Sequence, residues 1–556
     1  MRDIQISIEN QPAIKIVAGT LVRDLLPAKA PNGLDVLAAL VNNEVVSLNH
    51  PLVVNAQIAP LTLADNHGWR VYRWSLGFLL AMAMRAMAPS TPFRIRHSLG
   101  NGLFCSVKWS ETDSVIPLAA RVTRIEHAMR EIVSRNLPIE PELHSYEDAL
   151  SLFAETSQTD TINLLRHRNP PHVALLRCDQ FLDLLHEQPI VHRTGLLPLF
   201  QLVPYEAGFV LDMPAVETPT RVAPFEPQPH LFHVYQEHAA WGRILGVSTV
   251  GQLNETVVNK QVDDIIHTSE ALHEKKLAAI AATIASHRPT IRLVLAAGPS
   301  SSGKTTFAMR LVSHLRVNGL RPIVISTDDY FVGDEQNPRD DQGKLDYEHI
   351  ESMDLARLNH DLLELLEGRE VHLRFFDFRT KTGHDRPKPT RLGAQDVVIM
   401  EGIHCLNPQL TAQVPRAVKF LIYVSALTQL GVDRHNRIST TDNRLIRRLV
   451  RDDQYRGHGA LSTIQRWPSV QRGEKRWIFP FQHLADATFN SALDYELAVL
   501  KPFAVPLLDQ IKPSHPEYAE ARRLTGFLHN FLAIAPDIVP GNSILREYIG
   551  GSQLKY

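Results

Sequence analysis

The stretch "GPSSSGKTT", from Gly298 to Thr306, has the composition and spacing of a loop that binds phosphate groups. Gly298 and Gly303 are followed by Lys304 and Thr305, which matches the pattern G-x-x-x-x-G-K-[ST]. Glycines let backbone N–H groups reach phosphate oxygens, and the start of the following helix adds positive potential. The residues expected to form this cradle are Gly298, Ser300, Ser301, Ser302, Gly303, Lys304, Thr305 and Thr306.

Individual side chains in and near a loop of this kind have distinct roles in binding phosphate and metal. Lys304 is expected to reach the β- and γ-phosphates of ATP, and the Thr305 hydroxyl to bind Mg²⁺. Glu401 ends the apolar run "DVVIMEG" and fits a second carboxylate near Mg²⁺. Asp328 and Asp329 end the run "ISTDDYF" and compete for the role of the base that accepts a proton. If the backbone is still extended there, their side chains point to opposite sides and only one faces the loop.

Four arginines recur at helical spacing in "RLIRRLVRDDQYRG". Arg444, Arg447, Arg448 and Arg451 fall at i, i+3, i+4 and i+7 and therefore share one helix face, and Arg456 follows. Two interpretations stay open. The face is either a solvated basic surface or a cationic lid that stabilises the charge of a transferred phosphoryl group.

The elements that must position these residues begin near residue 289. The runs "IRLVLAA", "PIVIST", "DVVIMEG" and "VKFLIYVS" are continuously apolar and are separated by helical segments. Such runs predict strands that are covered on both faces, and hence a parallel sheet flanked by helices.

The first 288 residues have a different pattern. "IKIVAGT" reads as a strand, and Asn42-Asn43 predict a tight hairpin turn in "VLAALVNNEVVSL". "YRWSLGFLLAMAMRAM" and "CDQFLDLLHEQ" are expected to be helices. The proline-rich "VETPTRVAPFEPQPH" predicts a linker before a long helix over 262–287.

Bulk properties bound the class of protein. A chain of 556 residues implies about three to four domains. A net charge of −2 lacks the basic excess of a dedicated nucleic-acid binder, and three scattered cysteines fit a reducing cytoplasm. The first residues have no apolar signal core, and the longest apolar run is too short to span a membrane, so we expect a cytoplasmic protein without a membrane partner.

The loop, the carboxylates and the arginine stretch together resemble the uridine kinase and phosphoribulokinase family over about residues 290–505. The resemblance implies Asp328 as the base and Asp346, in "KLDYEHIESMD", as the residue that holds the ribose hydroxyls. It places Phe376, in "RFFDF", against the nucleobase of the acceptor. Lys381 lies near the position of the family's pyrimidine-reading histidine, and His384 lies slightly after that position. It also implies contacts to phosphate and substrate from Arg448, Arg451 and Arg456.

The N-terminal half carries two further resemblances. "IVAGTLVRDLL" and "AALVNNEVVSL" resemble the TGS domain, a small β-grasp module, and the next unit resembles the editing domain of threonyl-tRNA synthetase. There the chemistry needs histidines and a cysteine, but this chain has Trp74, Phe78, Leu185 and Ile190 at or near those places. Apolar side chains cannot bind zinc or move protons, so we expect the editing chemistry to be lost.

These observations predict a multidomain α/β protein with a β-grasp module, an α+β synthetase-like domain and a C-terminal P-loop kinase. The expected boundaries are 1–65, 66–215, a linker and helix over 216–288, the kinase over 289–510, and a tail over 511–556 packed on the kinase. The expected activity is phosphorylation by ATP and Mg²⁺ of a small hydroxyl acceptor, the 5′-hydroxyl of uridine or a related nucleoside.

Two alternatives stay open: a kinase for another metabolite, such as a sugar phosphate, and an RNA- or ribosome-associated regulator that uses ATP binding as a switch. The sequence leaves the oligomeric state undefined.

Overall fold

The computed structural model describes residues 2–9, 11–168, 170–186, 188–340 and 343–555, which fold as two compact units. The first unit comprises residues 1–262, 429–439 and 505–533, and the second comprises 263–428, 440–504 and 534–556. Two segments from the expected kinase and tail regions, 429–439 and 505–533, therefore belong to the first unit. Each unit has its own buried cores.

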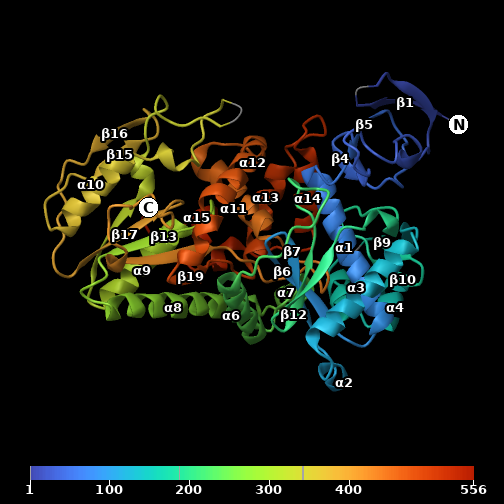
Figure 1. Ribbon diagram of the computed structural model, residues 1–556, viewed down its shortest axis with the longest axis horizontal. Coiled ribbons are helices and arrows are strands. Elements are labelled where there is room, and N and C mark those ends of the chain that lie inside the picture. Colours follow the sequence, from blue (N-terminus) through green and yellow to red (C-terminus); the bar gives the residue numbers. More distant parts are fainter. Residues whose placement is uncertain (1, 10, 169, 187, 341–342, 556) are drawn as a thin grey trace. The chain divides into compact units, whose positions relative to one another are not determined.

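The first unit begins with a five-stranded sheet in the order β2-β1-β5-β3-β4 (Figure 1). Asn42 and Asn43 have φ values of 49° and 62°, which is the left-handed conformation that a two-residue hairpin turn needs. The predicted hairpin is therefore confirmed. The strands are β1 (Asp3–Ile8), β2 (Ile14–Val17), β3 (Ala38–Val41), β4 (Glu44–Val46) and β5 (Ala56–Leu61).

The rest of the first unit packs around α1 (Asn66–Met87), the predicted long helix, most of whose residues are buried. Two antiparallel sheets, β10-β9-β8 and β11-β12-β7-β6, complete its core. The further elements are β6 (Phe93–Leu99), β7 (Gly102–Val107), α2 (Glu111–Ser114), α3 (Leu118–Ser134), β8 (Glu140–Ser145), α4 (Tyr146–Glu155), α5 (Thr159–Leu165), β9 (His172–Cys178), β10 (Phe181–Leu184), β11 (Gln201–Tyr205), β12 (Gly208–Asp212), α6 (Pro229–Leu245), α7 (Val250–Val258) and α14 (Tyr518–Leu528).

One predicted helix in this unit is wrong. "CDQFLDLLHEQ" contains the turn between β9 and β10, whose register pairs Phe181 with Cys178. Asp179, between them, has a φ of 54° and closes a two-residue turn. The apolar residues of β10 were mistaken for one face of a helix because a short apolar run does not distinguish the two.

The second unit is built on a five-stranded sheet, β14-β17-β13-β18-β19, in which every pair is parallel, as predicted. Its strands are β13 (Leu293–Ala297), β14 (Arg321–Ser326), β17 (Asp396–Gly402), β18 (Lys419–Ser425) and β19 (Ala487–Asn490). Four of them are the predicted apolar runs. Figure 1 shows α9 (Lys304–Val317) alongside this sheet, and the long predicted helix is α8 (Val262–Ser286).

The remaining elements of this unit connect these strands or come after the last of them. They are α10 (Leu355–Leu366), the hairpin β15 (Arg374–Asp377) and β16 (Thr382–Asp385), α11 (Thr440–Arg456), α12 (Ala460–Trp477), α13 (Glu496–Leu508) and α15 (Arg546–Ile549). The chain leaves the central strand β13 at Ala297 and enters the glycine-rich loop there. In open parallel sheets, ligands bind at the carboxyl ends of the strands, so this edge is where a site is expected.

Candidate active site

The phosphate loop connects β13 to α9, and its backbone has the shape of an anion cradle. Ser301 and Gly303 have φ values of 59° and 81°, both in the left-handed region. Left-handed residues within a tight loop turn successive N–H groups toward one concave side, where they bind anions. At Gly298 a Cβ atom would lie 1.9 Å from the Val424 carbonyl oxygen, so only glycine lets the loop lie this close to β18.

Side chains from distant parts of the chain hold this loop. The Ser300 N–H donates to Glu474 at 3.2 Å, and Arg448 Nη1 donates to the Ser300 hydroxyl at 2.9 Å. The Ser301 carbonyl accepts from the Tyr548 hydroxyl at 3.1 Å. Helices α11 and α12 and the C-terminal segment thus fix the loop conformation.

The arginine face of α11 divides into two parts. Arg444 and Arg447 are 2 % and 0 % exposed and form ion pairs with the buried Glu474 and Glu496. Buried charges need such partners, and these two arginines therefore support structure. They belong neither to a solvated basic surface nor to a mobile lid.

The other arginines surround Asp452, which is 1 % exposed. Arg451 Nη2 lies 2.7 Å from Asp452 Oδ1, Arg448 Nε lies 3.2 Å from Oδ2, and Arg456 Nε lies 3.7 Å from Oδ1. Three cations share one carboxylate, which leaves a net positive cluster. Because Arg448 also touches Ser300, this cluster adjoins the phosphate loop.

Asp328 and Asp329 lie in a 3-10 turn, Thr327–Tyr330, rather than in extended backbone. They nevertheless face different neighbours. Desolvation raises the pKa of Asp328 against the opposing charges of Lys304, Arg456 and Arg451. Asp329 instead pairs with Arg386, Oδ2 to Nη2, at 2.9 Å. Asp328 is thus the aspartate that interacts electrostatically with Lys304 and the arginine cluster.

Glu401 is the penultimate residue of β17 and is 7 % exposed. Its Oε1 accepts from the Ser326 hydroxyl at 3.0 Å. Burial and the charge of Asp328 raise the pKa of Glu401 to about 7, against the charge of Lys304. Two carboxylates that repel one another beside a lysine are suited to a divalent cation with phosphate oxygens.

Two buried hydroxyls in the loop also point to a polar ligand. Among the described residues, the Ser301 and Ser302 side-chain oxygens have no hydrogen-bond partner, although both residues are at most 3 % exposed. Buried hydroxyls ordinarily find partners. The donor set around Lys304 and Thr305 therefore fits a Mg²⁺–triphosphate group.

The residues predicted to hold the acceptor lie in the segment around Asp346 and in the β15–β16 hairpin. Asp346 Oδ1 accepts from the Glu348 N–H at 3.1 Å, and Glu348 is electrostatically coupled to Lys304 and Arg448. Lys381 Nζ lies 3.0 Å from the Tyr347 hydroxyl. Asp346 is thus connected to the phosphate side of the site through Glu348.

Phe376, in β15, belongs to an aromatic cluster. It is only 3 % exposed and packs with Phe331 and Phe378 at ring-centroid distances of 6.0 and 5.1 Å. Phe378 and Tyr347, which both pack against Phe331, are 57 % and 40 % exposed. A planar ligand on this cluster would therefore meet these exposed rings, with Phe376 behind them.

Several residues of the site were not predicted. Glu474, Glu496 and Glu547 each contact the loop, α9 or the arginines that hold them. The signal in sequence was the excess of arginine on a helix whose face is also partly apolar, because such arginines need acidic partners. Which carboxylates supply them depends on tertiary contacts.

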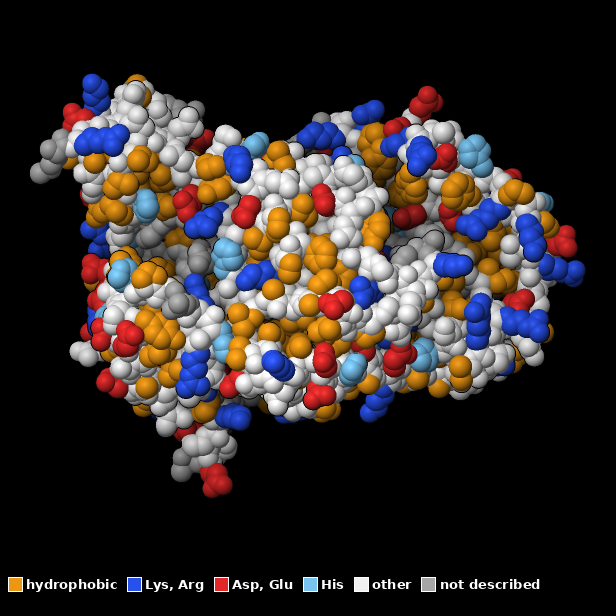
Figure 2. Space-filling view, turned by 180° about the vertical axis from the view of Figure 1, so that it is seen from behind, with side chains coloured by type: hydrophobic (Ala, Val, Ile, Leu, Met, Phe, Trp, Pro, Cys, Tyr) orange, Lys and Arg blue, Asp and Glu red, His pale blue; other side chains and the backbone are white. Residues whose placement is uncertain are grey.

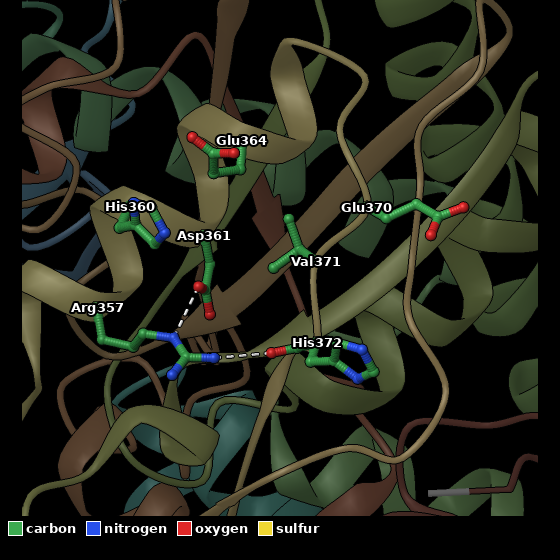
Figure 3. A pocket seen from close by; sticks show the side chains of 7 residues that line it. All are labelled: Arg357, His360, Asp361, Glu364, Glu370, Val371 and His372. Atoms are coloured by element: carbon green, nitrogen blue, oxygen red, sulfur yellow. Dashed lines mark hydrogen bonds and ion pairs between the residues drawn. The ribbon is translucent and has the colours of Figure 1, made fainter.

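A surface pocket of about 280 Å³ lies at α10 and the segment after it (Figure 3). Arg357 bridges to Asp361 and to the His372 carbonyl oxygen there. The pocket contains none of the predicted site residues.

An apolar core of the first unit contains the residues expected at or near the editing positions. Phe78 and Ile190 are 7 % and 6 % exposed, and Trp74 and Leu185 pack against the same cluster. The described residues contain no group of three or more metal-binding side chains. His186, next to Leu185, pairs with Asp433 at 2.8 Å.

Residues 293–498 match the Phosphoribulokinase / Uridine kinase family. The predicted resemblance is therefore confirmed for this region. A uridine kinase of Ureaplasma urealyticum is 26% identical over 178 residues, which is 32% of this chain and 77% of that protein. One from Lactobacillus johnsonii is 26% identical over 216 residues, 38% of this chain and 92% of that protein.

The relation to threonine–tRNA ligases over the N-terminal region is also confirmed. The ligase of Desulforamulus reducens is 28% identical over 205 residues, which is 36% of this chain and only 31% of the ligase. A solved structure titled "Possible Uridine Kinase", from Bacillus stearothermophilus, covers 39% of this chain and 98% of its own, with a TM-score of 0.25 and 21% identity. Among the described helices, none has the length and apolarity needed to cross a membrane.

Proposed function

We propose that the chain transfers the γ-phosphoryl group of ATP to a small hydroxyl acceptor, and that the acceptor is the 5′-hydroxyl of uridine or a related nucleoside. One observation carries the proposal. At the carboxyl edge of a parallel sheet, a phosphate loop and an arginine cluster adjoin an aspartate that interacts electrostatically with their cations. The family match and the uridine kinase relatives support it.

Each residue then has a role. Lys304 and the loop amides hold the triphosphate, and Thr305 and Glu401 hold Mg²⁺, which would neutralise charge on the phosphates. Asp328 accepts the proton of the acceptor hydroxyl, and its raised pKa suits a base. Arg448 and Arg451 stabilise the charge that spreads over the transferred group.

The acceptor side uses the remaining predicted residues. Asp346 holds the sugar hydroxyls, Phe376 underlies the aromatic surface for the base, and Lys381 and Arg456 contact the substrate. Exposed aromatic rings beside the site favour an acceptor with a flat ring over a sugar phosphate, because a sugar phosphate would need additional cations. The domain boundaries given above, with a kinase over 289–510, are part of this proposal.

A screen of nucleosides and sugar phosphates for ATP-dependent phosphorylation tests the proposal. Turnover of uridine or cytidine with Mg²⁺ and without RNA is expected. Turnover confined to a sugar phosphate would overturn the nucleoside assignment, and absence of any turnover with intact ATP binding would overturn the kinase assignment.

The RNA-associated alternative rests on the threonine–tRNA ligase relation of the N-terminal region. On the described surface in Figure 2, basic and acidic side chains are interspersed, which gives little support to a backbone-tracking RNA site there. RNA retention that falls steeply with salt would favour this alternative.

A further inference from the structure

The C-terminal segment places a carboxylate on the start of helix α9. Glu547 Oε2 accepts from the Thr306 hydroxyl at 2.6 Å and from the Thr306 N–H at 3.4 Å. Thr306 is the third residue of α9, so its N–H is one of the first-turn donors at the N-terminus of the helix. Those donors are the ones that a phosphate loop offers to phosphate oxygens.

The segment that carries Glu547 is firmly placed. Ser543, Ile544, Leu545 and Tyr548 are each 0 % exposed. A Cβ atom at Gly303 would lie 2.7 Å from Ile544 Cγ2, so the segment lies directly on the loop. The backbone around Glu547 is therefore part of the core.

Glu547 itself differs from these neighbours, because its side chain is only partly buried. It can leave Thr306 by rotation without moving the buried segment. Carboxylate and phosphate oxygens carry the same sign of charge, so a phosphate oxygen that accepts from the Thr306 N–H would be repelled by the Glu547 carboxylate on the same threonine.

We infer that Glu547 is an internal competitor for the phosphate position at Thr306, and that it sets the affinity of the loop for nucleoside triphosphate. The inference rests on the proposed ATP-binding role of this loop. Binding of ATP requires the Glu547 side chain to turn away from Thr306. Any change that draws Glu547 off this threonine raises nucleotide affinity without altering the loop.

The test measures ATP binding directly, by calorimetry of the full chain with Mg²⁺ and no acceptor. Glu547→Gln removes the charge and keeps the shape, and ATP is expected to bind roughly 10- to 100-fold more tightly, the range for a lost charge-assisted contact. Glu547→Asp keeps the charge with a shorter reach and is expected to give a smaller gain. Glu370→Gln, which removes a charge from an exposed residue of the same unit, is the matched control and should leave affinity unchanged.

The outcomes separate this inference from the proposed function. Unchanged or weaker ATP binding in folded Glu547→Gln overturns the competition. Lys304→Ala provides the other arm, because it should weaken ATP binding whatever Glu547 does. If Lys304→Ala binds ATP as the wild type does, the phosphate-loop role itself fails.

Discussion

The pair Asp328→Asn and Asp329→Asn tests the proposed mechanism most directly. Both substitutions remove one carboxylate charge at neighbouring positions of the same 3-10 turn. They differ in what the carboxylate contacts. Asp328 interacts with Lys304 and the arginine cluster, whereas Asp329 pairs with Arg386.

The expected magnitudes follow from these surroundings. An amide at position 328 cannot accept a proton as a carboxylate does, so kcat should fall by roughly 10² to 10⁴, the range for a general base. The Asp329–Arg386 pair has side chains that are 14 % and 47 % exposed. Such a pair contributes about 0.2–1 kcal/mol to stability, so Asp329→Asn should fold normally and, with the Asp328 carboxylate intact, lower kcat far less than Asp328→Asn does.

Affinity for ATP distinguishes a lost base from a damaged site. Asp328→Asn removes a negative neighbour of Lys304, so ATP should bind as well as before or more tightly. The assay is steady-state phosphorylation of the best acceptor at saturating ATP, with ATP affinity measured separately. A strong loss of kcat in Asp329→Asn and not in Asp328→Asn would show that the base is misassigned. Full activity in both variants would refute the carboxylate-base mechanism.

Other predictions address the remaining parts of the molecule. Lys304→Ala should cut turnover by on the order of 10² or more, because a preorganised cation at the phosphates is lost, and near-normal turnover of the folded variant would refute the loop assignment. Protein purified without chelators should contain no stoichiometric zinc and should not deacylate aminoacyl-tRNA, and one zinc per chain in residues 66–213 would contradict the apolar alignment. Burial lowers the pKa of His435, but Asp183 and Asp433 outweigh it and the net shift is upward. Its stabilisation is therefore complete below about pH 6.5 and is lost as pH rises through the folded pKa, so the difference in unfolding free energy between wild type and His435→Gln should shrink from pH 6 to 8 in denaturant titrations. Glu401, with a pKa of about 7, should release about half a proton when Mg²⁺–ATP binds at pH 7, which calorimetry in buffers of different ionisation enthalpy would detect and Glu401→Gln should abolish.

Local signals in the sequence were sufficient for four strands of the second unit's sheet and for its glycine-rich loop. Continuous apolar runs predicted four parallel strands, and the spacing of Gly298, Gly303 and Lys304 predicted the loop and the start of α9. These features depend on neighbouring residues, so they are readable without tertiary information. The same holds for the Asn42-Asn43 turn, where the conformation follows from residue type.

Features that depend on distant partners could not be predicted. The arginines of α11 share one face in sequence, yet Arg444 and Arg447 are buried against Glu474 and Glu496. Arg448 contacts the loop, and Arg451 pairs with Asp452. Helical spacing gives the face, but burial decides which arginine is structural. The helix predicted where β9 and β10 form a hairpin was wrong because the apolar residues there fit either a strand or a helix.

The motif alone does not account for a working phosphate loop, because its backbone must already hold the shape that the ligand needs. Ser300 is held by Glu474 and Arg448, and the Ser301 carbonyl by Tyr548. These contacts come from α11 and α12, which lie between β18 and β19 in sequence, and from the C-terminal segment. Phosphoryl transfer depends on positioning and electrostatics, so groups that order the loop before binding reduce the entropy lost on reaching the transition state. Under the proposed function, α11, α12 and the C-terminal segment are therefore positioning elements for the loop, although none of their acidic residues belongs to the motif.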